Sequence, residues 1–320
     1  MVAGTLREVW VVDAVRTPCG RYGGALSGVR PDDLAAHVVR ALVGRSPALD
    51  PARVDEVVLG TANGAGEDNR NVGRMAALLA GLPVSVPGST VNRLCASGLE
   101  AVVQAYRAVA VGDASLVVAG GVESMSRAPF TMEKPDRAFP AAPPRVHSTA
   151  LGWRQVNAAM DPAWTVSLGE GAELVADRHG IDRAAQDRFA LESHRRAAAA
   201  WRAGAHAAEV VAVPGVELER DEPIRDDGDT ASLARLRPAF RDEGGTVTAG
   251  NSSPLSDGAA ALLLADEAGV AATGREPLAR VTATAVTALE PQYFGPGAPG
   301  VRLAAAVSAC AGRSCGCGVG

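Results

Sequence analysis

The stretch Val91-Asn-Arg-Leu-Cys95-Ala-Ser97-Gly-Leu-Glu100 decides how this part of the chain folds. Ser97 and Glu100 have the S-x-x-E spacing of a capping box, which marks the start of a helix. We therefore expect a helix that begins at Ser97, buries one face and has Cys95 just before its first turn. The apolar side chains that recur at helical intervals are Leu99, Val102, Val103, Tyr106 and Val109.

The position of Cys95 suggests chemistry. The first turn of a helix leaves backbone N–H groups without partners, and its positive end favours a thiolate. The same N–H groups can bind an oxyanion formed on a thioester carbonyl. A thiolate with such donors is what acyl transfer through a covalent thioester requires. The alternative is structural, because an unpaired cysteine often packs as a small hydrophobic residue.

The segments around this stretch alternate between strand and helix patterns. This alternation predicts an α/β fold with right-handed crossovers. Between about Gly121 and Gly245 the composition shifts, so we expect a core that is interrupted by an inserted subdomain. Strands are expected at residues 9–12, 54–59, 116–119, 246–248 and 259–265, and helices at 33–42, 71–82, 173–178 and 183–202.

The composition excludes several classes of protein. Of the 320 residues, 47% are hydrophobic and 21% charged, which are globular proportions rather than those of a disordered chain. The net charge of -5 argues against non-specific nucleic-acid binding as the main task. We expect no export signal, because the charged residues Arg7 and Glu8 fall where a signal peptide would be apolar. We also expect no apolar run long enough to span a membrane. The expected location is cytoplasmic.

The five cysteines are too few for a disulfide framework in a chain of this length. Three of them, Cys310, Cys315 and Cys317, crowd near the C-terminus without a nearby histidine and make a poor zinc site. We expect no metal, and a tail without regular structure.

Four segments, in the same order along the chain, resemble motifs of the thiolase family. The stretch around Cys95 resembles N-x-x-C-x-S-G, and Arg16-Thr-Pro-Cys-Gly-Arg-Tyr-Gly-Gly24 resembles R-T-P-x-G-x-x-G-G. Gly120-Gly-Val-Glu-Ser-Met125 with Ser126 resembles G-G-x-E-S-M-S. The stretch from Gly245 to Ser253, followed by Asp257-Gly-Ala-Ala260, resembles G-T-V-T-A-G-N-x-S…D-G-A-A. On these motifs the chain is identified as a member of the family.

The resemblance implies a fold and a domain plan. Thiolases have a layered α-β-α-β-α core with an inserted loop domain. By this resemblance, residues 1–120 form the N-terminal core domain, 121–244 the inserted loop domain and 245–270 the return to the core. Residues 271–320 would be an aberrant start of the second core domain, which is largely missing.

The resemblance also implies an activity. Cys95 would take the acyl group from a 3-oxoacyl-CoA and hand it to coenzyme A, the co-substrate, with no permanently bound cofactor and no metal. Ser253 would contact the pantetheine arm and Arg225 the adenine; the alternatives are turn capping for Ser253 and a solvated surface position for Arg225. Glu123 and Met125 would fix the loop beside the site. A homodimer or homotetramer is expected.

The preferred substrate follows from finer similarity. Residues 21–26, 66–75 and 151–154 are most similar to thiolases that act on 3-oxoadipyl-CoA, which give succinyl-CoA and acetyl-CoA in the β-ketoadipate route of aromatic degradation. Arg154 would suit a carboxylate-ended acyl chain. The alternatives are a short-chain acetyl-CoA acetyltransferase, an inactive CoA-binding remnant and a decarboxylating enzyme of the ketosynthase type.

The sequence departs from the family pattern in its last part. The N-E-A-F, G-H-P and C-x-G-x-G motifs are absent, no histidine follows His206, and the last asparagine is Asn251. The resemblance persists to about Gly297, so a shifted reading frame or an early stop is our hypothesis. Sequencing the DNA beyond this point tests it, because an alternative frame should restore the missing motifs. We expect the chain as it stands to be poorly soluble or inactive.

Overall fold

The computed structural model describes residues 6–295, which form two compact units. The predicted boundaries at 120, 244 and 270 stay a prediction. Unit 1, however, also includes residues 200–223, which the sequence grouped with the inserted part. Unit 1 takes the described residues of Met1–Pro129, Ala200–Pro223 and Leu255–Val281, and unit 2 those of Phe130–Ala199, Ile224–Pro254 and Thr282–Gly320.

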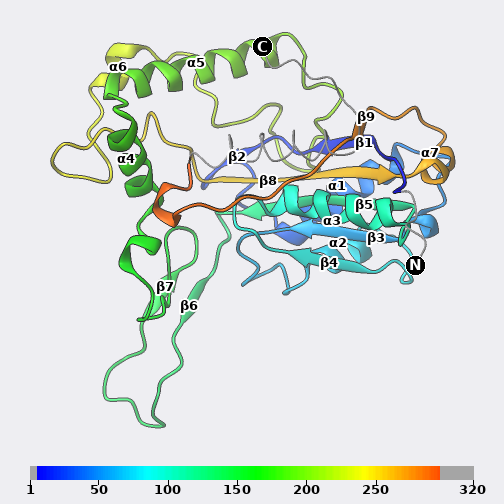
Figure 1. Ribbon diagram of the computed structural model, residues 1–320, viewed down its shortest axis with the longest axis horizontal. Coiled ribbons are helices and arrows are strands. Elements are labelled where there is room, and N and C mark those ends of the chain that lie inside the picture. The colour runs from blue at the N-terminus through cyan, green and yellow to red at the C-terminus, as the bar shows by residue number, and fades with distance from the viewer. Residues whose placement is uncertain (1–5, 296–320) are drawn as a thin grey trace. The chain divides into compact units, whose positions relative to one another are not determined.

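Unit 1 is built on a mixed sheet of seven strands in the order β4-β3-β5-β8-β1-β9, with β2 paired to β8 (Figure 1). Strands β4, β3 and β5 are parallel, whereas β8 is antiparallel to both β5 and β1. This confirms the α/β class. The strands are β1 (Val9–Arg16), β2 (Gly20–Arg21), β3 (Glu56–Gly60), β4 (Gly88–Val91), β5 (Leu116–Ser124), β8 (Ser256–Ala265) and β9 (Ala279–Val281).

Helices cover both faces of this sheet. Successive strand side chains point to opposite faces, so Val57 and Leu59 of β3 join one core cluster and Val58 joins the other. The first cluster contains α1 and α2, and the second contains α3. The helices and short turns of unit 1 are α1 (Pro31–Gly44), η1 (Pro51–Arg53), α2 (Val72–Leu79), α3 (Ser97–Val111) and α7 (Glu267–Thr273).

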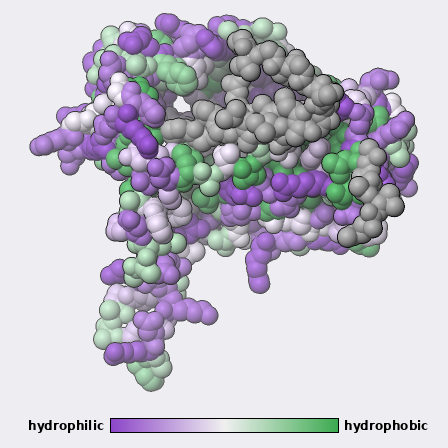
Figure 2. All heavy atoms as spheres, viewed as in Figure 1, coloured by the Kyte–Doolittle hydropathy of each residue, from purple (hydrophilic) through white to green (hydrophobic). Residues whose placement is uncertain are grey.

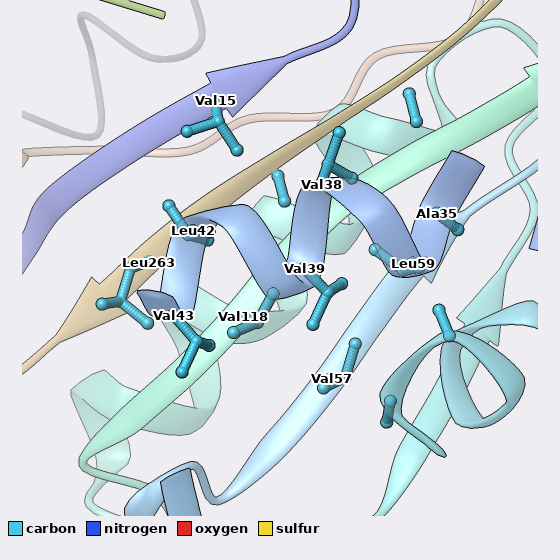
Figure 3. Packing of buried hydrophobic residues seen from close by; sticks show 14 of the residues in the cluster. Val15, Ala35, Val38, Val39, Leu42, Val43, Val57, Leu59, Val118 and Leu263 are labelled. Atoms are coloured by element: carbon cyan, nitrogen blue, oxygen red, sulfur yellow. The ribbon is translucent and has the colours of Figure 1, made fainter. Parts of the chain in front are cut away.

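Helix α1 supplies the largest apolar face of the core. Its side chains point at residues of β3, β5 and β8 (Figure 3). Burying each large aliphatic side chain contributes about 1.5–3 kcal/mol. The helix predicted at 33–42 is confirmed as α1, which extends slightly beyond the predicted residues at both ends. The α1 residues of this face are Ala35, Val38, Val39, Leu42 and Val43, and they pack with Val57, Leu59, Val118 and Leu263.

Helix α3 corrects one expectation. The window Leu94–Val111 is long and apolar enough to cross a membrane by length and composition, although no such run was expected. Ala101, Ala105 and Val109 are buried in the cluster that packs on β3 and β5, as in a core helix. Among the residues that the structure describes, no other helix meets this criterion.

Unit 2 consists of helices and a two-stranded hairpin. The hairpin pairs β6 with β7, and hydrophobic and hydrophilic residues lie side by side over its surface (Figure 2). The predicted helix at 183–202 is confirmed as α5, whose last residues are counted with unit 1. The elements are β6 (Phe130–Met132), β7 (Val146–Ser148), η2 (Pro162–Thr165), α4 (Leu168–His179), α5 (Arg183–Arg202), α6 (Thr230–Ala234) and η3 (Pro291–Tyr293).

The predicted strand at 246–248 is wrong. The fully buried carboxylate of Glu173 on α4 accepts hydrogen bonds from the N–H groups of Thr246 and Val247, each at 2.8 Å, and from the Thr246 hydroxyl at 2.6 Å. These N–H groups are the ones that a strand would use for its ladder. Only an isolated bridge between Pro238 and Thr248 remains.

Replacing Glu173 by glutamine should destabilise unit 2 by about 2 kcal/mol at neutral pH, because the amide cannot accept as many hydrogen bonds from the buried donors. Burial alone would raise the pKa of Glu173, but the hydrogen bonds from Thr246 and Val247 outweigh it and hold the pKa below its ordinary value. The carboxylate therefore stabilises the fold above the pKa of an unfolded glutamate, and this stabilisation is lost as pH falls through the folded pKa.

Urea unfolding of the wild type and Glu173→Gln measures this effect at neutral pH and at about pH 3. The difference should shrink at the lower pH. Glu192→Gln is the matched control, because Glu192 forms a solvent-exposed ion pair with Arg196. An equal loss in both variants would contradict the account.

Candidate active site

Helix α3 begins at Ser97, as predicted, but not through the predicted capping box. The N-cap is Ala96, which has no side-chain cap. The Ser97 hydroxyl instead accepts from the N–H of Arg93 at 2.8 Å and donates to the carbonyl of Leu94 at 2.6 Å. Glu100 pairs with Arg93 at 2.8 Å. Ser97 is the first residue of the helix rather than its N-cap, and its hydroxyl stabilises the turn at residues 93–96 that precedes the helix.

That preceding turn presents the cysteine. The Ala96 N–H donates to the Arg93 carbonyl and the Ser97 N–H donates to the Leu94 carbonyl, at 3.1 and 3.0 Å. Leu94 has φ of 50°, in the left-handed region that non-glycine residues rarely adopt. Such strained backbones persist only where the surrounding structure holds them, and they are frequent at active sites. The turn therefore places Cys95 directly before α3.

Cys95 is exposed at the open end of this helix. In the part of the chain that the structure describes, the N–H groups of Gly98 and Leu99 have no acceptor. These groups carry the positive end of the helix dipole, which stabilises a nearby anion. The packing of Cys95 as a small hydrophobic residue, the structural alternative, does not occur.

Glycines let the start of α3 approach the sheet. A Cβ on Gly60, the last residue of β3, would lie 2.1 Å from the carbonyl carbon of Ser97. A Cβ on Gly121 in β5 would lie 3.2 Å from the Cα of Gly98. The helix N-terminus is thus seated where the parallel strand β3 ends, which is the usual place of sites in α/β sheets. Gly121 is the second glycine of the G-G-V-E-S-M segment, and its close approach to Gly98 explains why this position lacks a Cβ.

Three of the four motif segments are joined by one buried carboxylate. Asp257, which is 1% exposed, accepts from the N–H and the hydroxyl of Ser126, at 2.9 and 2.6 Å. The N–H of Gly23 donates to the same hydroxyl at 2.8 Å. Asp257 therefore fixes the turn after β5 and, through it, the N-terminal segment.

The loop after β3 is held by Glu123. Its carboxylate accepts from the N–H of Ala62 at 2.7 Å. Burial is the main effect on Glu123 and raises its pKa, and nearby Asp68 adds to the rise. The hydrogen bond from Ala62 lowers the pKa, but the net effect is a rise. Farther along the loop, Glu67 pairs with Arg127 at 2.6 Å. These contacts agree with a loop-fixing role for Glu123.

Sequence reasoning missed the partners of the Arg16-Thr-Pro-Cys segment. Arg16 pairs with Asp221 at 2.8 Å and with Glu209 at 2.9 Å, both from the 200–223 segment. The N–H of Cys19 donates to Asp221 at 2.8 Å. Desolvation by the surrounding chain and the carboxylate of Asp221 raise the pKa of the Cys19 thiol, although Cys19 is exposed. No local pattern signals these pairs, because their partners lie far away in sequence.

Ser253 and Arg225 lie in unit 2, whereas Cys95 lies in unit 1. Both are exposed. The turn before Ser253 is fixed by other residues: the Thr248 N–H donates to Asn251 at 2.7 Å, and the Ser252 hydroxyl donates to the Thr248 carbonyl at 2.6 Å. The side chains of Asn251 and Ser252 therefore cap this turn. The backbone N–H of Arg225 donates to His194 at 3.3 Å.

No group of three or more His, Cys, Asp or Glu side chains that could hold a metal occurs within residues 6–295. Cys310, Cys315 and Cys317 and the rest of the C-terminal tail lie outside the described residues, so the predictions made for them stay predictions.

Comparison with known proteins decides the family. Residues 9–268 match the family model described as thiolase, N-terminal domain. The chain belongs to the thiolase family. It is 51% identical over 304 residues to beta-ketoadipyl-CoA thiolase of Pseudomonas aeruginosa, covering 92% of this chain and 75% of that protein. It is 50% identical over 300 residues to 3-oxoadipyl-CoA/3-oxo-5,6-dehydrosuberyl-CoA thiolase of Escherichia coli K12, covering 91% of this chain and 74% of that thiolase.

The fold is that of a thiolase as well. The crystal structure of the Bacillus anthracis acetyl-CoA acetyltransferase matches with a TM-score of 0.83 and 35% identity, over 94% of this chain and 76% of that chain. The expected thiolase-like α/β core is thereby confirmed. Thiolases use CoA thioesters as substrates without a bound cofactor.

Proposed function

We propose that this thiolase transfers an acyl group from a 3-oxoacyl-CoA to coenzyme A through a thioester on Cys95. The observation that carries the proposal is the exposed Cys95 before the uncapped N-terminus of α3. The proposed substrate is 3-oxoadipyl-CoA, because relatives of about 50% identity bear that activity in their names. A cytoplasmic location and a homodimer or homotetramer remain predictions.

The reaction divides into two half-reactions. In the first, Sγ of Cys95 attacks the ketone carbon C3 of 3-oxoadipyl-CoA, and the bond between C2 and C3 breaks. The electron pair stays on C2, which takes up a proton and leaves as acetyl-CoA, while a succinyl group remains on sulfur. In the second, the thiol of CoA attacks this thioester and leaves as succinyl-CoA, which frees Cys95.

The described part of the site supports the first half-reaction. Helix α3 directs its positive end and the free N–H groups of Gly98 and Leu99 at the segment that carries the reacting sulfur. We expect acylation of Cys95 that a single-turnover experiment can detect.

We further propose that coenzyme A is held by unit 2. Ser253, exposed and outside the hydrogen bonds of its own turn, would contact the pantetheine arm. Arg225, exposed as well, would lie against the adenine. Replacing either residue should weaken CoA binding in a calorimetric titration without changing the reactivity of Cys95.

Intact-mass measurement after incubation with 3-oxoadipyl-CoA or acetoacetyl-CoA tests the proposal. We expect a succinyl adduct to form faster than an acetyl adduct. Faster formation of the acetyl adduct would favour the short-chain acetyltransferase. Absence of both adducts would contradict acyl transfer and favour a CoA-binding remnant.

A further inference from the structure

The turn before Cys95 is strained. The inference from this strain rests on the proposed role of Cys95 as the nucleophile. Leu94 has φ of 50°, and the residue is 55% exposed. A left-handed backbone is unfavourable for leucine because its Cβ crowds the following carbonyl oxygen. An exposed side chain gains little from burial, so the conformation must be held by the backbone partners of the turn.

Asn92 supplies one such partner. It directly follows β4, and its Oδ1 accepts from the N–H of Leu94 at 2.9 Å. Its Nδ2 donates to the carbonyl of Ala62 at 3.0 Å. One amide group thus links the turn to the loop that follows β3. The asparagine amide offers an acceptor and donors from one uncharged planar group on a short side chain.

The far end of this link is itself fixed. Glu123 in β5 accepts from the N–H of Ala62 at 2.7 Å, and the N–H of Thr61 donates to the carbonyl of Val91 at 3.2 Å. The two consecutive peptide groups before Ala62 are therefore held by neighbouring strands. An amide bonded to this loop is anchored to the sheet rather than to a freely moving segment.

We propose that Asn92 is a positioning residue that holds Leu94 in its left-handed conformation and thereby sets Cys95 at the start of α3. Asn92 touches no reacting atom in this account. It acts through the N–H of Leu94, and Ala62 and Glu123 hold Asn92 in place.

Alkylation by iodoacetamide measures the effect without any CoA. Cleavage after arginine releases Leu94–Arg107, in which Cys95 is the one cysteine, so its modification can be followed separately. We expect Asn92→Ala to slow alkylation of Cys95 about tenfold, which corresponds to about 1.4 kcal/mol. Adding Leu94→Gly should restore most of the rate, because glycine adopts positive φ without strain.

Two further variants sharpen the test. Asn92→Asp keeps the shape and the acceptor for Leu94 but loses the donor to Ala62, so it should also slow alkylation. Asn71→Ala is the matched control: Asn71 caps α2 by accepting from the N–H of Arg74, and its loss should lower the melting temperature without slowing the reaction of Cys95.

The outcomes separate positioning from general stability. Rescue of Asn92→Ala by Leu94→Gly supports the proposal, since a structural defect elsewhere would not respond to a glycine at this position. Failure of that rescue, a wild-type rate in Asn92→Asp, or equal slowing in Asn71→Ala would overturn it. If acyl-CoA leaves no adduct while the rescue succeeds, the proposed function fails and the role of Asn92 stands.

Discussion

Replacing Gly60 by alanine is expected to destabilise unit 1 by about 3 kcal/mol, at the upper end of the cost of overpacking. The new Cβ would lie 2.1 Å from the carbonyl carbon of Ser97 and 2.2 Å from its oxygen. Both are backbone atoms, so no side-chain rotation can relieve the overlap. The start of α3 must move away from β3, and the alkylation rate of Cys95 should change with it.

Gly44→Ala is the matched control for this prediction. Gly44 is the last residue of α1, and a Cβ there would meet no atom within 4 Å. Alanine is favoured over glycine in a helix by about 0.5–1 kcal/mol, so this variant should be neutral or slightly more stable. Urea unfolding compares the two. Equal stability of Gly60→Ala and the wild type would show that α3 is not seated on Gly60.

Replacing Cys95 by alanine should lower acyl transfer to the protein by at least about a hundredfold, because a covalent mechanism cannot proceed without its nucleophile. Cys19→Ala should retain the activity. The pKa of the Cys19 thiol is raised by desolvation and by the carboxylate of Asp221, so less of this thiol is ionised at neutral pH. Its exposure alone does not make it a nucleophile.

A single-turnover assay with 3-oxoadipyl-CoA measures both cysteine variants. Each variant must retain the wild-type melting temperature for the comparison to hold. Loss of acyl transfer in Cys19→Ala, with retention in Cys95→Ala, would show that Cys19 and not Cys95 is the nucleophile. Equal rates in both would indicate acylation at many sites without a built nucleophile.

Several helices could be predicted from the sequence because their signals are local. Helix α5 has the predicted bounds, and α3 begins at Ser97 as predicted. The capping box was wrong, since S-x-x-E spacing does not determine which residue precedes the helix. The strand at 246–248 was wrong because the competing acceptor, Glu173, is far away in sequence.

The candidate site was only partly accessible to the same reasoning. The motif around Cys95 predicted a helix-terminal cysteine, and the structure places it there. The seating of Ser97 on Gly60 and the link from Asn92 to Ala62 depend on pairing between segments that are distant in sequence. Hydrophobic periodicity carries no information on such contacts. The left-handed conformation of Leu94 has no signal either, because leucine is not a residue that favours it.

Site-resolved mass spectrometry after brief exposure to 3-oxoadipyl-CoA tests whether Cys95 accepts the acyl group. We expect a succinyl group on the peptide Leu94–Arg107, and its release when coenzyme A is added. A succinyl group found on the peptide with Cys19, or on lysine and serine side chains instead, would contradict it.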